Sequence, residues 1–96
     1  MNEFFERLGE LWVEAAKKHG GKIDKPGLDS RVALELLELA RVAAHTQERR
    51  FAPLSSYLAG VAAERLRTAK TGVDDGEVAE LIQEVRKQLE REVPGI

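Results

Sequence analysis

The chain has 96 residues, of which 43% are hydrophobic and 33% are charged, with a net charge of −2 and no cysteine. This length suits one small domain, and a chain of this size buries enough surface for a single core. The lack of cysteine excludes disulfides and thiolate metal sites. Nucleic-acid binders normally carry a surplus of basic residues that neutralises phosphates, and this chain has none overall, so we expect no nucleic-acid partner.

The membrane classes are also disfavoured by the pattern of apolar residues. No apolar run approaches the about 20 residues that a bilayer-spanning helix needs. The first residues carry charges of both signs and lack the apolar core of a signal peptide. We therefore expect a cytoplasmic protein with no membrane partner.

Residues 2–19 are predicted to form the first helix. Its apolar side chains recur with the 3.6-residue period of one helix face, at Phe4, Leu8, Leu11, Trp12 and Ala15. Asn2 suits the N-cap, and Gly20 suits the left-handed position after the last turn. Residues 20–29, with Gly20-Gly21 and Pro26-Gly27, are predicted to be a loop.

Residues 30–45 are predicted to form a second helix that is apolar around most of its circumference. One narrow polar stripe interrupts it and is expected to reach solvent, at Arg31, Glu35, Glu38, Arg41 and His45. A helix that is apolar nearly all round is typically a buried helix. We therefore expect the second helix at the centre of the fold.

Residues 53–70 are predicted to form the third helix, with Pro53 at its first position, where the missing N–H is no loss. Its expected buried stripe consists of Leu54, Tyr57, Leu58, Val61, Ala62 and Leu66. Gly60 lies among small residues in the middle of this helix, although glycine costs up to about 1 kcal/mol there relative to alanine. This predicts a close helix crossing at Gly60, against Ala40, Ala43 and Ala44.

Residues 75–92 are predicted to form the fourth helix, where Asp74 and Glu77 match the capping-box pattern. Its apolar stripe consists of Val78, Leu81, Ile82, Val85 and Leu89. No period-two strand pattern is present. Four helices joined by short loops predict an all-α fold, a compact antiparallel four-helix bundle with a buried second helix, as one domain over residues 1–96.

The junction between the second and third helices holds the candidate binding residues, His45, Glu48, Arg49, Arg50, Ser55 and Ser56. A helix that starts at Pro53 has Ala52 at its N-cap, which is a poor cap, so its first N–H groups need another acceptor. One candidate is the carboxylate of Glu48, within a hydrogen-bonded cluster with His45 and Arg49. The other is an external anion such as phosphate.

Catalytic and metal sites have little support in the sequence. His45 and Glu48 stand three residues apart, but a metal site needs three or four ligands. No serine lies in a nucleophile elbow, and Ser55 and Ser56 in a first helical turn suit capping. We therefore predict no catalytic residue, no metal and no cofactor, and a chain that is not an enzyme.

The string from Leu36 to Arg65 resembles a small, mostly actinobacterial family of helical domains of unknown function. Its members carry Ala-x-x-Val-Ala-His-x-x-Glu-Arg-x-x-Ala-Pro-Leu-Thr-x-Phe-Leu-x-Gly-x-Ala. The matching residues here are His45, Glu48, Arg49, Ala52, Pro53, Leu54 and Gly60. The chain departs from that pattern at Ser55, where the family often has Thr, at Tyr57, where it often has Phe, and at Glu64-Arg65, where many members have Gly-Arg.

The resemblance implies a link to molybdenum-cofactor biosynthesis, since such domains occur alone or appended to molybdenum-cofactor guanylyltransferase-like nucleotidyltransferases. Our first hypothesis is a non-enzymatic accessory module for protein interaction. Its partner would be a second copy, as a homodimer, or a protein of the nucleotidyltransferase or molybdoenzyme-maturation pathway. The alternative is a small anion- or nucleotide-binding module that uses the His45–Ser56 junction.

Overall fold

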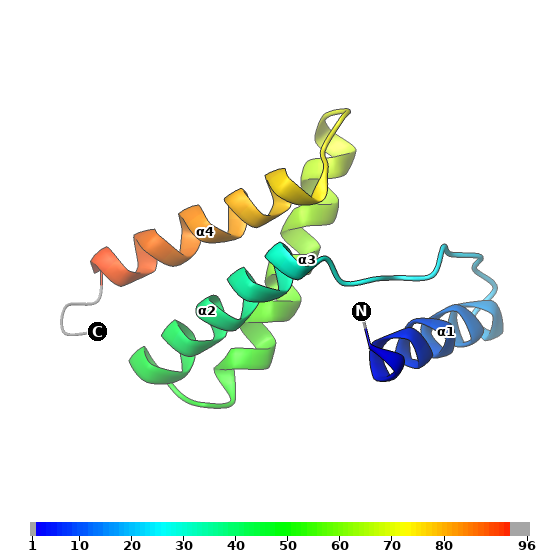
Figure 1. Ribbon diagram of the computed structural model, residues 1–96, viewed down its shortest axis with the longest axis horizontal. Coiled ribbons are helices and arrows are strands. Elements are labelled where there is room, and N and C mark those ends of the chain that lie inside the picture. Colours follow the sequence, from blue (N-terminus) through cyan, green and yellow to red (C-terminus); the bar gives the residue numbers. More distant parts are fainter. Residues whose placement is uncertain (1, 93–96) are drawn as a thin grey trace. The chain divides into compact units, whose positions relative to one another are not determined.

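The computed structural model describes residues 2–92 and contains four helices and, within that range, no strand (Figure 1). They are α1 (Glu3–Lys18), α2 (Ser30–Thr46), α3 (Phe51–Ala69) and α4 (Asp75–Glu92). The predicted all-α class is confirmed, and each helix begins and ends within two residues of its predicted bounds. None of these four helices is long and apolar enough to cross a bilayer. The chain divides into two compact units, Met1–Ser30 and Arg31–Ile96.

The first unit consists of α1 and the segment that follows it. At the start of α1, the Oδ1 atom of Asn2 accepts a hydrogen bond from the backbone N–H of Phe5 at 3.2 Å. At its end, Gly20 has a φ of 83°, and the N–H of Gly21 donates to the carbonyl of Ala16 at 2.9 Å. This is a Schellman closure, whose left-handed residue favours glycine. Both predicted caps are confirmed.

The segment after α1 passes over the helix at Gly9, which is buried. A Cβ atom at Gly9 would lie 2.7 Å from the carbonyl oxygen of Pro26 and 2.9 Å from Cγ of Lys25. The backbone can approach α1 this closely only because residue 9 has no side chain. Lys25 also pairs with Glu6, with 2.5 Å between Nζ and Oε2, and this exposed pair lowers the pKa of Glu6 and raises that of Lys25.

The second unit packs α2, α3 and α4 around a small apolar core. Its buried cluster and the side chains packed on it come from all three helices and the last loop: Leu39, Ala63, Val78 and Ile82, with Val32, Leu36, Ala59, Val73 and Leu89. α2 contributes Leu39 to the buried cluster, and its other buried residues are Val42 and Ala43. Leu34 and Leu37 remain exposed on α2. Burial of the second helix is therefore confined to one face, whereas the sequence predicted burial nearly all round.

The turn from α3 to α4 largely follows the sequence prediction. Gly72 has a φ of 77°, and Oδ1 of Asp74 accepts from the N–H of Glu77 at 2.8 Å, so the N-cap of α4 is confirmed. The reciprocal half of the capping box is absent. The carboxylate of Glu77 instead accepts from Nζ of Lys70 at 2.5 Å, which ties the end of α3 to the start of α4.

Gly60 lies on the exposed side of α3, and an added Cβ would meet no atom within 4 Å. The predicted close crossing at Gly60 is therefore wrong. α3 contacts the core instead through Ala59 and Ala63, which stand one turn apart. Small residues flank Gly60 on both sides in the sequence, so composition alone did not reveal which face of the helix packs.

We expect Gly60→Ala to raise the free energy of unfolding by about 0.5–1 kcal/mol, because alanine removes the entropic cost of a helical glycine and meets open space. Urea denaturation followed by circular dichroism measures this change. Gly76→Ala is the control, and a smaller gain is expected because its Cβ would lie 3.2 Å from Nη1 of Arg31. A loss of stability in Gly60→Ala would contradict the placement of Gly60 on the exposed side of α3.

Candidate functional site

α3 begins at Phe51, two residues before the predicted start, and its N-cap Arg50 offers no side-chain hydrogen bond. The backbone closes the first turn instead. The N–H of Phe51 donates to the carbonyl of Glu48 at 3.0 Å, and the N–H of Ala52 donates to that of Arg49 at 3.1 Å. Since Pro53 has no N–H, the first three helical positions need no external acceptor.

The predicted capping role of Glu48 is wrong for this reason. Its carboxylate accepts from Nε of Arg50 at 2.9 Å, in an ion pair between two exposed side chains. His45 and Arg49 are exposed, and neither side chain has a hydrogen bond or ion pair within residues 2–92. The predicted cluster of His45, Glu48 and Arg49 therefore does not form. No acceptor is missing at the helix start, so nothing draws these side chains together.

The two serines of the junction lie inside α3. Oγ of Ser56 donates to the carbonyl of Ala52 at 3.2 Å, a bond within the helix. Ser55 lines an apolar groove. Among residues 2–92, no group of three or more His, Asp or Glu side chains is placed to hold a metal ion. The role of the six junction residues in binding a ligand stays a prediction.

The groove lies between α3 and α4 and has a volume of about 290 Å³. Among the residues that the structure describes, its one polar lining residue is Ser55, and the remaining lining is Leu39 of α2, Leu58, Ala59 and Ala62 of α3, and Leu81, Ile82, Val85 and Leu89 of α4. Leu58 is 66% exposed and Val85 is 51% exposed, so the two walls of the groove present apolar surface to solvent. A hollow of this composition suits an apolar ligand surface.

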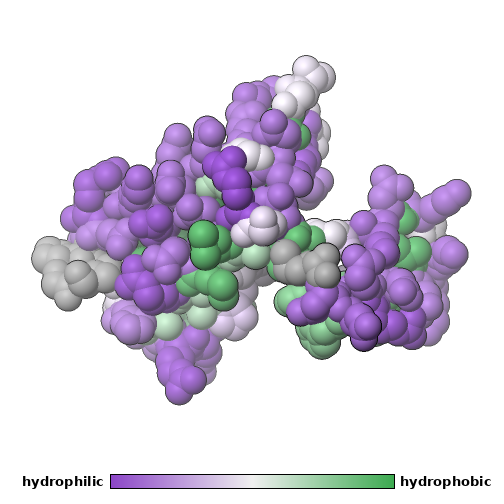
Figure 2. Space-filling model, viewed as in Figure 1, coloured by the Kyte–Doolittle hydropathy of each residue, from purple (hydrophilic) through white to green (hydrophobic). Residues whose placement is uncertain are grey.

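The helical periodicity of α3 predicted that this apolar surface belongs to the core. Leu54, Tyr57 and Leu58 were expected to be buried, and all three are exposed. Figure 2 shows apolar side chains grouped on the surface of the body that α2, α3 and α4 form. The available signal was the width of the apolar arc on α3, which runs around the helix from Ala63 through Leu58 to Tyr57 and is wider than one packing face requires.

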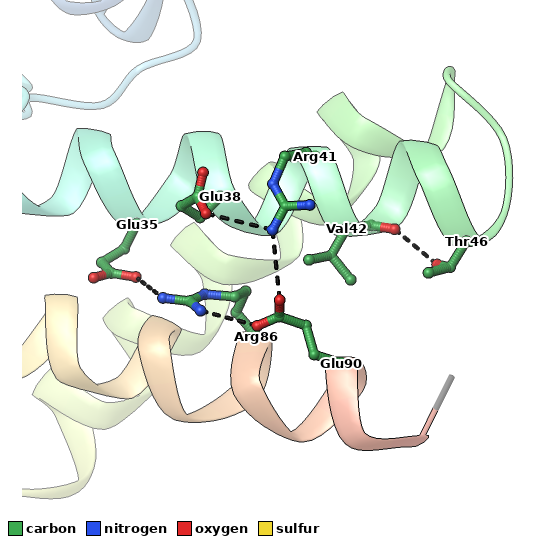
Figure 3. Close-up of polar contacts among 7 residues, drawn as sticks. All are labelled: Glu35, Glu38, Arg41, Val42, Thr46, Arg86 and Glu90. Carbon is green, nitrogen blue, oxygen red and sulfur yellow. Dashed lines mark hydrogen bonds and ion pairs between the residues drawn. The ribbon is translucent and has the colours of Figure 1, made fainter. Parts of the chain in front are cut away.

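A charged network fastens α2 to α4 (Figure 3). The guanidinium of Arg86 donates from Nη1 to Glu90 at 2.9 Å and from Nη2 to Glu35 at 3.3 Å. Arg41 reaches both Glu38, at 3.4 Å, and Glu90, at 3.5 Å. The side chains of Arg86 and Glu35 are each only 15% exposed. The polar stripe of α2, expected to face solvent, thus partly faces α4.

The electrostatics of this network favour its charged form. The hydrogen bond from Arg86 lowers the pKa of Glu90 below the ordinary value of 4.5, and burial opposes that shift. The same bond to Glu90 raises the pKa of Arg86. Three carboxylates surround two guanidinium groups, so the network is internally paired and offers no free positive charge to an anion. Its arrangement suits a structural role.

Comparison with known proteins assigns the sequence to a family without assigning an activity. Residues 6–94 match the family model described as a domain of unknown function, DUF6457. No curated protein and no solved structure matches the chain significantly. Function therefore has to be inferred from the side chains themselves.

We expect Arg86→Met to lower the free energy of unfolding by about 1–3 kcal/mol at neutral pH, because Glu35 and Glu90 lose a largely buried partner. The control is Arg67→Met. Arg67 also bridges two carboxylates, Glu64 at 2.7 Å and Asp75 at 3.2 Å, but is 36% exposed. Its loss should cost less than about 1 kcal/mol.

The same variant tests the pH dependence. Because the pKa of Glu90 is lower in the folded state than its ordinary value of 4.5, the pairing stabilises the fold above that pH and is lost as the pH falls through the folded pKa. The free energy of unfolding, obtained from denaturation curves at a series of pH values, should therefore fall less steeply between neutral and acidic pH for Arg86→Met than for the wild type. If the free energy of unfolding depends on pH in the same way in both proteins, the pairing of Arg86 with Glu90 does not stabilise the fold.

Proposed function

The chain belongs to this family of domains of unknown function, DUF6457, and on that premise we propose that it is a non-enzymatic helical accessory module that binds a protein partner. The observation that supports this proposal is the groove between α3 and α4. Contiguous exposed apolar surface is characteristic of interaction sites, and an apolar groove between helices is a common receptor for a helix of another protein.

The chemistry of the groove also favours binding over catalysis. Within residues 2–92, Ser55 is the only polar residue that lines it. General acid–base catalysis requires a titratable side chain within hydrogen-bond reach of the reacting group. The groove walls instead supply Leu58, Leu81 and Val85, whose burial by a partner would contribute about 25 cal/mol for each Å² removed from water.

The partner that we propose belongs to molybdenum-cofactor biosynthesis or molybdoenzyme maturation, such as a nucleotidyltransferase. This part of the proposal rests on the resemblance of residues 36–65 to mostly actinobacterial domains that also occur fused to such enzymes. The same segment contributes Leu39, Ser55 and Leu58 to the groove, so the resemblance and the groove fall on one part of the chain. A cytoplasmic location would follow from such a partner.

The second candidate function is binding of a small anion or nucleotide at the His45–Ser56 junction. His45 and Arg49 favour it, since both side chains are exposed and neither has a partner within residues 2–92. The closed backbone at the start of α3 weakens it, because the amides of Phe51 and Ala52 already donate to protein carbonyls. Any such site would rely on side chains alone.

We expect Leu58→Asp to abolish capture of the partner. Tagged wild-type chain and variant would be compared in pull-downs, the recovered protein identified by mass spectrometry, and binding then measured with that protein purified. Leu34→Asp is the matched control, because Leu34 is 63% exposed and does not line the groove. Circular dichroism checks that both variants fold. Equal capture by Leu58→Asp and wild type would overturn the groove as the binding site.

The junction candidate is tested by calorimetric titration with GTP, molybdate and phosphate. If the junction binds an anion, Arg49→Ala should weaken affinity by about tenfold, the effect of a lost charge-assisted hydrogen bond of about 1.5 kcal/mol. Arg50→Ala is the control, since Arg50 is already paired with Glu48. Absence of binding heat from the wild type with all three anions would eliminate this candidate.

A further inference from the structure

We infer that α1 is a self-association element, whose apolar stripe pairs with the same stripe of a second copy of the chain while the two helices run antiparallel. This surface is separate from the groove between α3 and α4 and is independent of the proposed function. Two observations carry the inference. The stripe is exposed, and the charges along its edge are complementary to themselves.

The apolar stripe of α1 has the heptad spacing of helices that pair in coiled coils. Phe4, Leu8, Leu11 and Ala15 follow one another at spacings of four, three and four residues. Phe4 is 68% exposed and Leu11 is 43% exposed. The segment after α1 crosses the helix at Gly9, which stands about 160° around the helix from Leu11, so this segment does not cover the stripe.

A hollow of about 300 Å³ lies on the stripe. Its lining consists of Leu8, Leu11, Trp12, Glu14, Ala15 and Lys18. Four of these residues have the i, i+3, i+4 and i+7 spacing of a hole that receives one side chain of a facing helix, and they are Leu11, Glu14, Ala15 and Lys18. In an antiparallel pair centred between Leu8 and Leu11, the side chain of the second copy that lies over this hole is Phe4.

The charges along one edge of the stripe alternate in sign. In chain order they are Glu3, Arg7, Glu14 and Lys18. Arg7 and Glu14 are seven residues apart and share one flanking heptad position, and Glu3 and Lys18 lie within about 40° of Arg7 around the helix. When two copies run antiparallel, the same edges meet. Arg7 of each copy then lies beside Glu14 of the other, and Lys18 lies beside Glu3.

Contacts within one chain leave these charges available to a second copy. Arg7 reaches both Glu10, at 3.4 Å, and Glu14, at 3.6 Å, so one exposed cation serves two carboxylates. Glu3 and Lys18 have no ion pair within residues 2–92. Because a two-fold axis repeats every contact, an antiparallel second copy supplies each of these four pairings.

The opposite edge of the stripe is aromatic, and it also favours the antiparallel direction. Phe5 and Trp12 stand on it seven residues apart, and Trp12 is 55% exposed. In an antiparallel pair, Phe5 of one copy lies near Trp12 of the other, which removes both rings from water. A parallel pair would set the aromatic edge of one copy against the charged edge of the other and would form no ion pair.

The oligomeric state of the full chain tests this pairing. The 10.7 kDa chain should change from monomer to dimer in sedimentation between about 10 μM and about 1 mM, as expected of a small interface. The emission of Trp12, the single tryptophan, should shift to shorter wavelength over the same range. Leu11→Asp should keep the chain monomeric, whereas Leu58→Asp, in the groove, should leave the dimer intact.

Charge exchange identifies the edge that pairs. Arg7→Glu alone and Glu14→Arg alone each set like charges against one another twice, so each should weaken the dimer about tenfold. An equimolar mixture of the two variants should associate as the wild type does, since every facing pair is then of opposite charge. Circular dichroism checks that α1 stays helical in both variants.

Lys17→Glu is the matched control for Arg7→Glu. It makes the same charge change at an exposed residue on the side of α1 away from the stripe, and should alter the dissociation constant less than about twofold. If it weakens the dimer as much as Arg7→Glu does, net charge and not the edge governs association, and the inference is overturned.

The remaining outcomes also decide the matter. A chain that stays monomeric at about 1 mM overturns the inference, whether Trp12 emits from water or from a covered site. A dimer that Leu58→Asp abolishes and Leu11→Asp spares assigns self-association to the groove and overturns it too. If the wild type dimerises but the mixed charge variants do not, the antiparallel pairing of the charged edge is wrong.

Discussion

The second unit of the structure depends on the bonds of Arg86 to Glu35 and Glu90. The guanidinium of Arg86, whose side chain is only 15% exposed, fixes both the contact between α2 and α4 and the rotation of α4 about its own axis. Because side chains on a helix hold fixed angular offsets, a helix whose Arg86 faces α2 must direct Leu81 and Val85 toward α3. The groove is therefore a consequence of this ion pair as much as of the apolar residues that line it.

The fold was predictable where the determining interactions are local. Asn2, Gly20 and Asp74 each act on a backbone group within a few residues, and all three predicted caps are present. The start of α3 was not predictable, because its first N–H groups donate to the backbone carbonyls of Glu48 and Arg49. A backbone carbonyl can belong to any residue type, so the sequence does not indicate this closure. The exposure of Leu54 and Leu58 could not be predicted either. It depends on how much of α3 its neighbours cover, which is a property of the packed unit.

The groove and the predicted junction are less separate than the sequence suggested. The sequence indicates Ser55 as a candidate because it lies in the predicted first turn of a helix beside two arginines, whereas the structure places it in the lining of the groove. Leu39, on the preceding helix, forms part of the same lining. The segment that carries the predicted polar site thus also supplies much of an apolar surface.

The backbone closure of α3 has a consequence for how sequence variation in this family should be interpreted. A conventional N-cap would place a structural constraint on one side chain of the junction, and substitutions there would be selected against because they unfold a helix. Here Pro53 and two carbonyls perform that task, so residues 45–50 are exempt from it. If His45 or Arg49 proves invariant among relatives, that invariance would report selection for recognition rather than for folding.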